Sequence, residues 1–197
     1  MKKASNDHRS RVTRMLIRRA FTQLLGSMPP ERISVKLLCE QAGINRGTFY
    51  AHYDDVYDLL GQLEEEMLED LKRALAPLMP MGEAPDDLAA VTAAVFQCLK
   101  DNSDLCTVTL GDYGDKAFLN RLLSLGRSAC MSVYSRCFSQ ATPQQLEYYY
   151  AFASSGCIGL LRKWMEEGMS TPAGEMARMA ERLMRTGMGF LQDDAPK

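Results

Sequence analysis

Histidine is scarce in this chain of 197 residues, which contains only His8 and His52. The six cysteines are scattered and include no Cys-x-x-Cys pair, so the ligand spacing of a zinc site is missing. Two distant histidines also make a poor start for a Ser/His/Asp or Cys/His catalytic set, and the sequence has no glycine-rich phosphate loop. We therefore expect no metal site, no cofactor, no catalytic residues and no enzymatic activity.

Long apolar runs are missing as well. No segment approaches the ~18 consecutive apolar residues that a membrane-spanning helix needs. The polar stretch at residues 1–9 has no apolar segment behind its charges, which is unlike a signal peptide. Hydrophobic residues make up 46% of the sequence and charged residues 24%, a composition typical of a globular protein with a sizeable core. We expect a cytoplasmic protein that does not bind a membrane.

The net charge is small, at −2, but the two signs are unevenly distributed along the chain. Residues 1–55 carry ten Lys and Arg against five Asp and Glu, a net charge of +5. The remaining 142 residues carry 13 basic against 20 acidic side chains, a net charge of −7. A basic segment followed by an acidic body indicates that the N-terminal part binds a polyanion.

Helical periodicity runs along nearly the whole chain, and no alternating strand pattern of comparable length competes with it. Local signals delimit the helices, since Ser34 is a typical N-cap, Gly43 a typical C-terminal stop and Thr142 the start of a capping box. The sequence predicts an all-α fold with a head over residues 1–55 and a helical body over residues 56–197. The expected helices cover about residues 12–25, 34–42, 45–53, 56–76, 86–100, 115–139, 142–168 and 171–191, with a short helix beginning at residue 103.

The stretch from residue 34 to residue 53 has the pattern of a helix-turn-helix motif. A short helix ends at Gly43, where a left-handed turn favours glycine, and Asn45 can cap a second short helix. Phe49 is expected to face the core. The other side chains of the second helix are then directed outward, and they are Arg46, Gly47, Thr48, Tyr50 and His52.

These outward side chains suit the groove of a nucleic-acid duplex. Arg46 can reach guanine O6 and N7 or a phosphate, and Thr48 can donate to a phosphate or touch a thymine methyl. Tyr50 and Tyr53 carry hydroxyls suited to phosphate oxygens. Lys36, near the start of the preceding helix, can hold the same backbone with its ammonium group. The motif alone is a weak indication, because many αα-hairpins never bind DNA.

Residues 42–53, AGINRGTFYAHY, and residues 55–60, DVYDLL, resemble the signature of the TetR/AcrR family of bacterial transcriptional regulators. Residues 148–164 resemble the dimerisation helix of one branch of that family, near regulators of dihydroxyacetone kinase operons. One departure concerns Val56, where the family usually has a lysine, and Asp54, which adds a negative charge beside it. The resemblance implies that a double-stranded DNA operator is contacted by Lys36, Arg46, Gly47, Thr48, Tyr50, His52 and Tyr53.

The resemblance further implies a homodimer and a small-molecule effector site in the body. The last two predicted helices have broad apolar faces, as in a four-helix bundle built from two copies. The expected dimer interface consists of Phe152, Gly156, Leu160, Trp164, Met176, Met179 and Leu183. Apolar stripes more often form plain core than a ligand site. The expected lining of an effector pocket consists of Met67, Leu71, Phe96, Leu99, Phe118, Leu122 and Tyr134.

Three functions are compatible with the sequence. The leading hypothesis is a dimeric, sequence-specific DNA-binding repressor that a small-molecule effector releases. The second is an activator or a ligand-independent regulator with the same fold. The third is a helical ligand-binding or interaction protein whose head has weakened or lost DNA binding, which Asp54 and Val56 favour.

Overall fold

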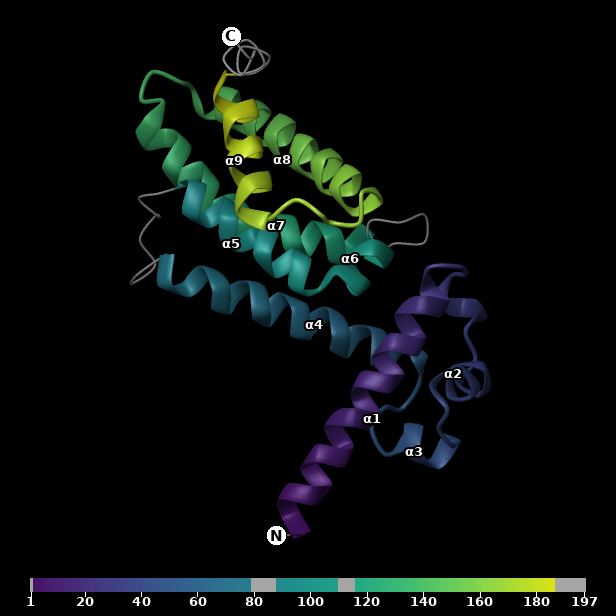
Figure 1. Cartoon of the computed structure of the whole chain (residues 1–197). Coiled ribbons are helices and arrows are strands. Elements are labelled where there is room, and N and C mark those ends of the chain that lie inside the picture. The colour runs from purple at the N-terminus through teal and green to yellow at the C-terminus, as the bar shows by residue number, and fades with distance from the viewer. Residues whose placement is uncertain (1, 79–87, 110–115, 187–197) are drawn as a thin grey trace. The chain divides into compact units, whose positions relative to one another are not determined.

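The computed structural model describes residues 2–78, 88–109 and 116–186 (Figure 1). These residues form helices throughout, and the described part of the chain contains no strand, which confirms the predicted all-α fold. Two short 3-10 helices, Pro30–Arg32 and Ala76–Leu78, accompany the α-helices. The α-helices of the described residues are α1 (Lys2–Leu25), α2 (Val35–Ala42), α3 (Arg46–Tyr50), α4 (Val56–Leu75), α5 (Leu88–Asp101), α6 (Ser103–Thr109), α7 (Lys116–Cys137), α8 (Pro143–Glu166) and α9 (Ala173–Thr186).

The described residues group into two compact units. The first unit is drawn from Met1–Met67 and Asp104–Lys116, and the second from Leu68–Ser103 and Ala117–Lys197. Helix α4 therefore supplies residues to both units. The first unit contains the predicted head and, in addition, the first half of α4 and a segment from much later in the sequence.

The first unit is built around α1, which packs against α2, while α2 packs against α3 (Figure 1). The buried face of α1 includes Ile17, Phe21 and Leu25, which recur at helical spacing. Val12 and Leu16, which continue the same pattern toward the N-terminus, are instead exposed. Helix α1 begins at Lys2, about ten residues before the start that the periodicity predicted. The sequence of residues 2–11 is polar, so it contains no apolar stripe from which the additional turns could have been predicted.

The second unit contains a core in which α5 packs closely against α9. Thr142 and Gln145 form the predicted capping box at the start of α8, with the Gln145 side chain accepting from the Thr142 backbone N–H at 2.8 Å. An apolar cluster joins α4, α5 and α7, and its members are Leu71, Leu75, Ala94, Val91, Val95, Cys98, Leu122 and Leu125. No helix among the described residues is long and apolar enough to cross a membrane.

The connection from α8 to α9 turns through two left-handed residues, Gly168 at φ 69° and Met169 at φ 51°. The Met169 N–H donates to Trp164 O at 2.9 Å, and the Trp164 indole donates to Thr171 O at 3.0 Å. Lys100 Nζ donates to Met169 O at 3.1 Å and lies 5.5 Å from the centre of the Trp164 ring. These contacts fix the turn between the last two described helices.

Candidate nucleic-acid interface

Helix α3 is only five residues long, and its geometry depends on the cap that precedes it. Asn45 Oδ1 accepts from the Thr48 backbone N–H at 2.7 Å and from the Thr48 hydroxyl at 2.9 Å. Upstream, Gly43 adopts the left-handed conformation at φ 67°, and the Ile44 N–H donates to Cys39 O at 3.0 Å. The turn and the cap predicted from the sequence are therefore both present, and they set the start of α3.

The inner face of α3 is anchored by one aromatic side chain. Phe49 is fully buried, as predicted, and its ring packs edge-on against Tyr50 at 5.5 Å between centroids. Leu38 and Cys39 of α2 are buried too. Because α3 is too short to be stable alone, this buried contact and the Asn45 cap hold it in place.

The outer face of α2 and α3 carries most of the predicted DNA-contacting residues. Arg46, Gly47 and Lys36 are exposed, and Tyr50 is 56% exposed. Lys36 Nζ lies 3.9 Å from Glu40 Oε1, an exposed pair that leaves the ammonium group in solvent. The exposed basic groups and the Tyr50 hydroxyl are thus accessible to a polyanion.

Thr48 and His52 are half-buried beside this face. The Thr48 hydroxyl donates to Asn45 Oδ1, so its predicted donation to a phosphate would require the hydroxyl to rotate away from Asn45. The cap bond from the Thr48 backbone N–H to Asn45 would remain. The contact between the Thr48 methyl group and a thymine methyl stays a prediction. An added Cβ at Gly47 would lie 3.4 Å from Asn45 Oδ1, which is an ordinary van der Waals contact, so the cap itself does not require glycine at this position.

Tyr53 departs from the expectation that it presents its hydroxyl on the outer face. Its side chain is only 3% exposed, and its ring packs against Phe49 at 5.7 Å between centroids. Its hydroxyl accepts from Arg14 Nε at 3.4 Å. The sequence could not separate Tyr53 from Tyr50, because the partner of the Tyr53 hydroxyl, Arg14, lies 39 residues earlier in the sequence.

Arg14 is a residue of this region that sequence reasoning did not single out. Its Nη2 donates to Gln62 Oε1 at 3.2 Å and lies 3.4 Å from Glu66 Oε1. With the bond to Tyr53, one arginine of α1 joins the end of the helix-turn-helix motif to α4. Sequence separations of 48 and 52 residues left no local signal for these contacts.

The start of α4 is capped by carboxylates. Asp55 Oδ1 accepts from the backbone N–H groups of Tyr57 and Asp58, both at 2.8 Å. Asp58 Oδ2 accepts from the Asp54 N–H at 2.9 Å, and this bond, together with hydrogen bonds from Gln62, lowers the pKa of Asp58. Two of the backbone amides that could hold a phosphate at this helix end, those of Tyr57 and Asp58, therefore already donate to a carboxylate of the chain itself.

The predicted dimer residues divide into exposed and buried groups. Phe152 is 72% exposed, Gly156, Met179 and Leu183 are exposed, and Leu160 is half-buried. Trp164 is 1% exposed and Met176 is buried. The prediction that Trp164 and Met176 lie at an interface is therefore wrong.

Trp164 and Met176 belong to the core of the second unit, because other helices of that unit pack against them. The Trp164 ring packs against Phe96 at 5.8 Å between centroids, and its indole N–H is satisfied by Thr171. Met176 lies in the first turns of α9, which packs against α5. A helix with apolar residues on two faces can bury one face in the core of its own chain and the other at an interface. The sequence alone does not indicate which face belongs to the core.

The predicted pocket residues lie in several apolar groups. Leu71 and Leu122 belong to the cluster that joins α4, α5 and α7, and Phe96 contacts Trp164. Tyr134 packs edge-on against Tyr149 at 4.9 Å between centroids, and burial raises the pKa of Tyr134. Phe118 is buried and Leu99 half-buried, while Met67 belongs to the first unit. An effector pocket lined by these residues stays a prediction.

A capped helix-turn-helix motif and an all-helical second unit define the architecture of a helix-turn-helix transcriptional regulator. A TetR C-terminal family model, described as a transcriptional regulator C-terminal region, matches residues 86–186, just over half of the chain. The chain belongs to the TetR family of transcriptional regulators. The comparison with curated proteins found no match.

Solved structures of similar fold extend over nearly the whole chain. The fatty acid degradation regulator FadR from Bacillus halodurans superposes with a TM-score of 0.67 at 16% identity, covering 90% of this chain and 96% of that one. FadR from Bacillus subtilis, in complex with stearoyl-CoA, gives 0.63 at 17% identity, covering 88% and 98%. A TetR regulator from Streptococcus agalactiae gives 0.57 at 21% identity, covering 92% and 98%. At these identities the likeness shows the fold.

Proposed function

We propose that this protein is a sequence-specific DNA-binding regulator that acts as a homodimer and represses transcription until a small-molecule effector binds. The observation that carries the proposal is the exposed, capped helix α3, with Arg46 and Tyr50 on its outer face. The N-terminal residues of such a recognition helix contact base edges in the major groove. Arg46 is the first residue of α3 and has the donor geometry that reads guanine.

The charge distribution supports the same assignment. Residues 1–55 carry a net charge of +5 in a chain whose net charge is −2. Lys36 is exposed at the start of α2, where it can contact a phosphate of the strand that α3 reads. Phosphate contacts of this kind set position and supply affinity, and base contacts supply specificity.

The exposed apolar residues of α8 and α9 support a homodimer. Phe152 and Gly156 lie one helical turn apart on α8, and Met179 and Leu183 lie one turn apart on α9, all exposed. A two-fold interface between such helix pairs would bury these side chains. A dimer also places two recognition helices about 34 Å apart, the spacing of successive major grooves.

The apolar second unit supports a small, mostly apolar effector. FadR from Bacillus subtilis carries stearoyl-CoA, a ligand with a long apolar chain. In this chain, the cluster around Leu71 and Leu122 and the ring pair Phe96–Trp164 are apolar groups that such a ligand would contact within the second unit. Release of DNA then requires that the effector binds the two states of the protein with different affinity.

A gel shift tests DNA binding directly. The protein is mixed with its own upstream region and with random DNA at two salt concentrations, and we expect retardation that weakens steeply as salt rises. Arg46→Ala should weaken specific binding by roughly 1–3 kcal/mol and leave random binding nearly unchanged. Arg32→Ala, an exposed arginine outside α3, is the matched control. Equal losses on both DNAs would make Arg46 a phosphate contact.

One observation favours a second function, a helical ligand-binding protein that has lost DNA binding. The start of α4 presents Asp54 and Asp55, both exposed, and its first amides are capped by Asp55. Both features oppose a phosphate at that position. If the wild-type protein retards neither its own upstream region nor neighbouring promoters at low salt, this second function replaces the first. The relation to regulators of dihydroxyacetone kinase operons and the cytoplasmic location stay predictions.

A further inference from the structure

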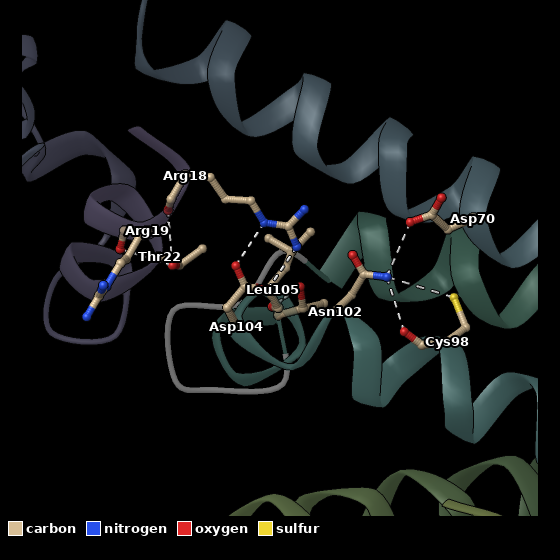
Figure 2. Close-up of polar contacts among 9 residues, drawn as sticks. Arg18, Arg19, Thr22, Asp70, Cys98, Asn102, Asp104 and Leu105 are labelled. Carbon is tan, nitrogen blue, oxygen red and sulfur yellow. Dashed lines mark hydrogen bonds and ion pairs between the residues drawn. The ribbon is translucent and has the colours of Figure 1, made fainter. Parts of the chain in front are cut away.

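A bidentate ion pair joins α1 to α6, a helix far along the sequence. Arg18 Nε donates to Asp104 Oδ2 at 2.8 Å, and Arg18 Nη2 donates to Asp104 Oδ1 at 2.8 Å (Figure 2). The two residues are 86 positions apart, yet both belong to the first unit. Asp104 lies on α6, so the pair fastens α6 to the helix that packs against the helix-turn-helix motif.

The geometry of this pair separates it from ordinary surface ion pairs. Both hydrogen bonds of the pair are short, and both side chains are partly buried. Solvent therefore screens these charges less than it screens the more exposed Arg14–Glu66 pair, whose contact is 3.4 Å. Burial by itself raises the pKa of Asp104, but the hydrogen bonds and charge of Arg18, together with hydrogen bonds from the backbone N–H groups of Leu105 and Asp104, outweigh burial, and the pKa lies below its ordinary value. Arg18 and Asp104 therefore hold a defined arrangement.

A second anchor lies two residues earlier, at the end of α5. Asn102 Nδ2 donates to Cys98 O at 3.1 Å and lies 3.5 Å from Asp70 Oδ2, and the Asn102 residue is 5% exposed (Figure 2). Asn102, Cys98 and Asp70 all belong to the second unit. Along the chain, only Ser103 separates a side chain anchored in the second unit from Asp104, which is anchored in the first.

We propose that Arg18 and Asp104 are positioning residues for DNA binding, and that the end of α5 influences DNA affinity through residues 102–104 and this ion pair. The inference rests on the proposed function, because it assumes that the head binds DNA. Beyond the proposed function, the inference names residues through which a change in the second unit alters the DNA affinity of the head, which lies in the first unit. Coupling between two sites requires a structural element that both sites influence. Residues 102–104 are such an element, because Asn102 is bonded within the second unit and Asp104 within the first.

Operator affinities of four variants test the positioning role. Arg18→Gln and Asp104→Asn each break the pair, and we expect each to weaken binding to the upstream region by about fivefold or more, the lower end of usual coupling. The double charge reversal R18D/D104R re-forms the pair and should restore most of the affinity. Arg18→Lys, which keeps the charge but has no planar fork, should fall between the wild type and Arg18→Gln.

The sign of the Asp104→Asn effect separates positioning from simple charge. Removing a negative charge without any positioning role would leave DNA affinity unchanged or tighten it, whereas removing a positive charge would weaken it. Arg19→Gln is the matched control, since Arg19 is the exposed neighbour on α1 and points away from Asp104 (Figure 2). Opposite effects of Arg18→Gln and Asp104→Asn, or equal losses in Arg18→Gln and Arg19→Gln, would overturn the inference.

Substitution of Asn102 tests the connection to the second unit. We expect Asn102→Ala to change operator affinity by about threefold or more in the wild-type background, and by less than about 1.5-fold in the Asp104→Asn background. Asp70→Ala serves as a second variant that removes one partner of the Asn102 amide. Additive effects in the two backgrounds would overturn the coupling. Circular dichroism and elution volume identify any variant that fails to fold.

The same gel shifts distinguish this inference from the proposed function. If the wild-type protein fails to retard DNA, the proposed function and the inference both fall. If the wild type binds and Arg46→Ala weakens specific binding, but Arg18→Gln and Asp104→Asn bind like the wild type, only the positioning role of the ion pair falls.

Discussion

Arg14 contacts both the hydroxyl and the ring of Tyr53 at the end of the helix-turn-helix motif. Its Nε donates to the Tyr53 hydroxyl at 3.4 Å, and its guanidinium carbon lies 5.9 Å from the centre of the Tyr53 ring. The ring itself is buried against Phe49. This relationship ties α1 to the residues that follow α3, and it gives Tyr53 a structural role in the first unit.

Tyr53→Phe should reduce stability slightly and leave DNA binding intact. The substitution removes the hydroxyl that accepts from Arg14 but keeps the buried ring, so we expect the free energy of unfolding to fall by about 0.5–1.5 kcal/mol. Urea unfolding measures the change, and a gel shift on the upstream region should show affinity within about twofold of the wild type. Tyr50→Phe is the control, with weaker operator binding and unchanged stability. A tenfold loss of operator affinity in Tyr53→Phe would contradict the structural role.

Asn45→Ala should weaken both stability and operator binding. It removes the acceptor of two hydrogen bonds at the start of α3, and loss of an N-cap costs about 0.5–2 kcal/mol. Asn45→Asp keeps the cap but adds a negative charge, so its operator affinity should fall while its urea midpoint stays near that of the wild type. If the alanine variant unfolds at the wild-type urea midpoint, the cap contributes little to α3.

Phe152→Asp should convert a dimer into a folded monomer. Phe152 is 72% exposed within one chain, so a carboxylate is tolerated there by the isolated chain and is costly inside an apolar interface. Size-exclusion chromatography with light scattering measures the mass, and circular dichroism measures the helix content. Tyr57→Asp, at an exposed aromatic residue of α4, is the control and should stay dimeric. A dimeric Phe152→Asp variant would place the interface elsewhere.

The Arg18–Asp104 pair should make stability depend on pH at the acid end. The pKa of Asp104 is lower in the folded protein than in the unfolded chain, so the unfolded state binds more protons as pH falls. Its stabilising contribution is complete above the ordinary aspartate pKa of about 3.9 and is lost as pH falls through the lower folded value. Asp104→Asn should therefore flatten the decline in unfolding free energy between about pH 5 and about pH 3.

The matched control for this pH dependence is Asp101→Asn, at an exposed aspartate of α5. Urea titrations at several pH values give the unfolding free energies of the three proteins. Parallel pH profiles for the wild type and Asp104→Asn would mean that the pair adds no acid-sensitive stability.

Local chemistry made much of the helix-turn-helix region predictable. Ser34, Gly43 and Asn45 mark their helix ends through bonds to residues three or four positions away, and the structure has those bonds. Thr142 acts in the same way at the start of α8. Signals of this kind depend on a few neighbouring residues, so a single sequence contains them in full.

Burial was harder to predict, because it depends on which elements meet. Trp164 and Phe152 lie on the same apolar helix, yet one is core and the other is exposed. Tyr50 and Tyr53 differ in the same way within four positions. The ion pair of Arg18 and Asp104 joins residues 86 positions apart, and nothing local to either residue indicates its partner.

The carboxylate of Asp55, which already binds the first amides of α4, has a consequence for operator choice. A DNA duplex would be bound by α2 and α3 of each head and repelled by the carboxylates at the N-terminus of α4. One head alone would therefore bind DNA weakly. Two heads on one duplex gain from high effective concentration, because the second contact becomes intramolecular. We expect isolated half-sites to be ignored and occupancy to rise sharply only where two half-sites have the correct spacing.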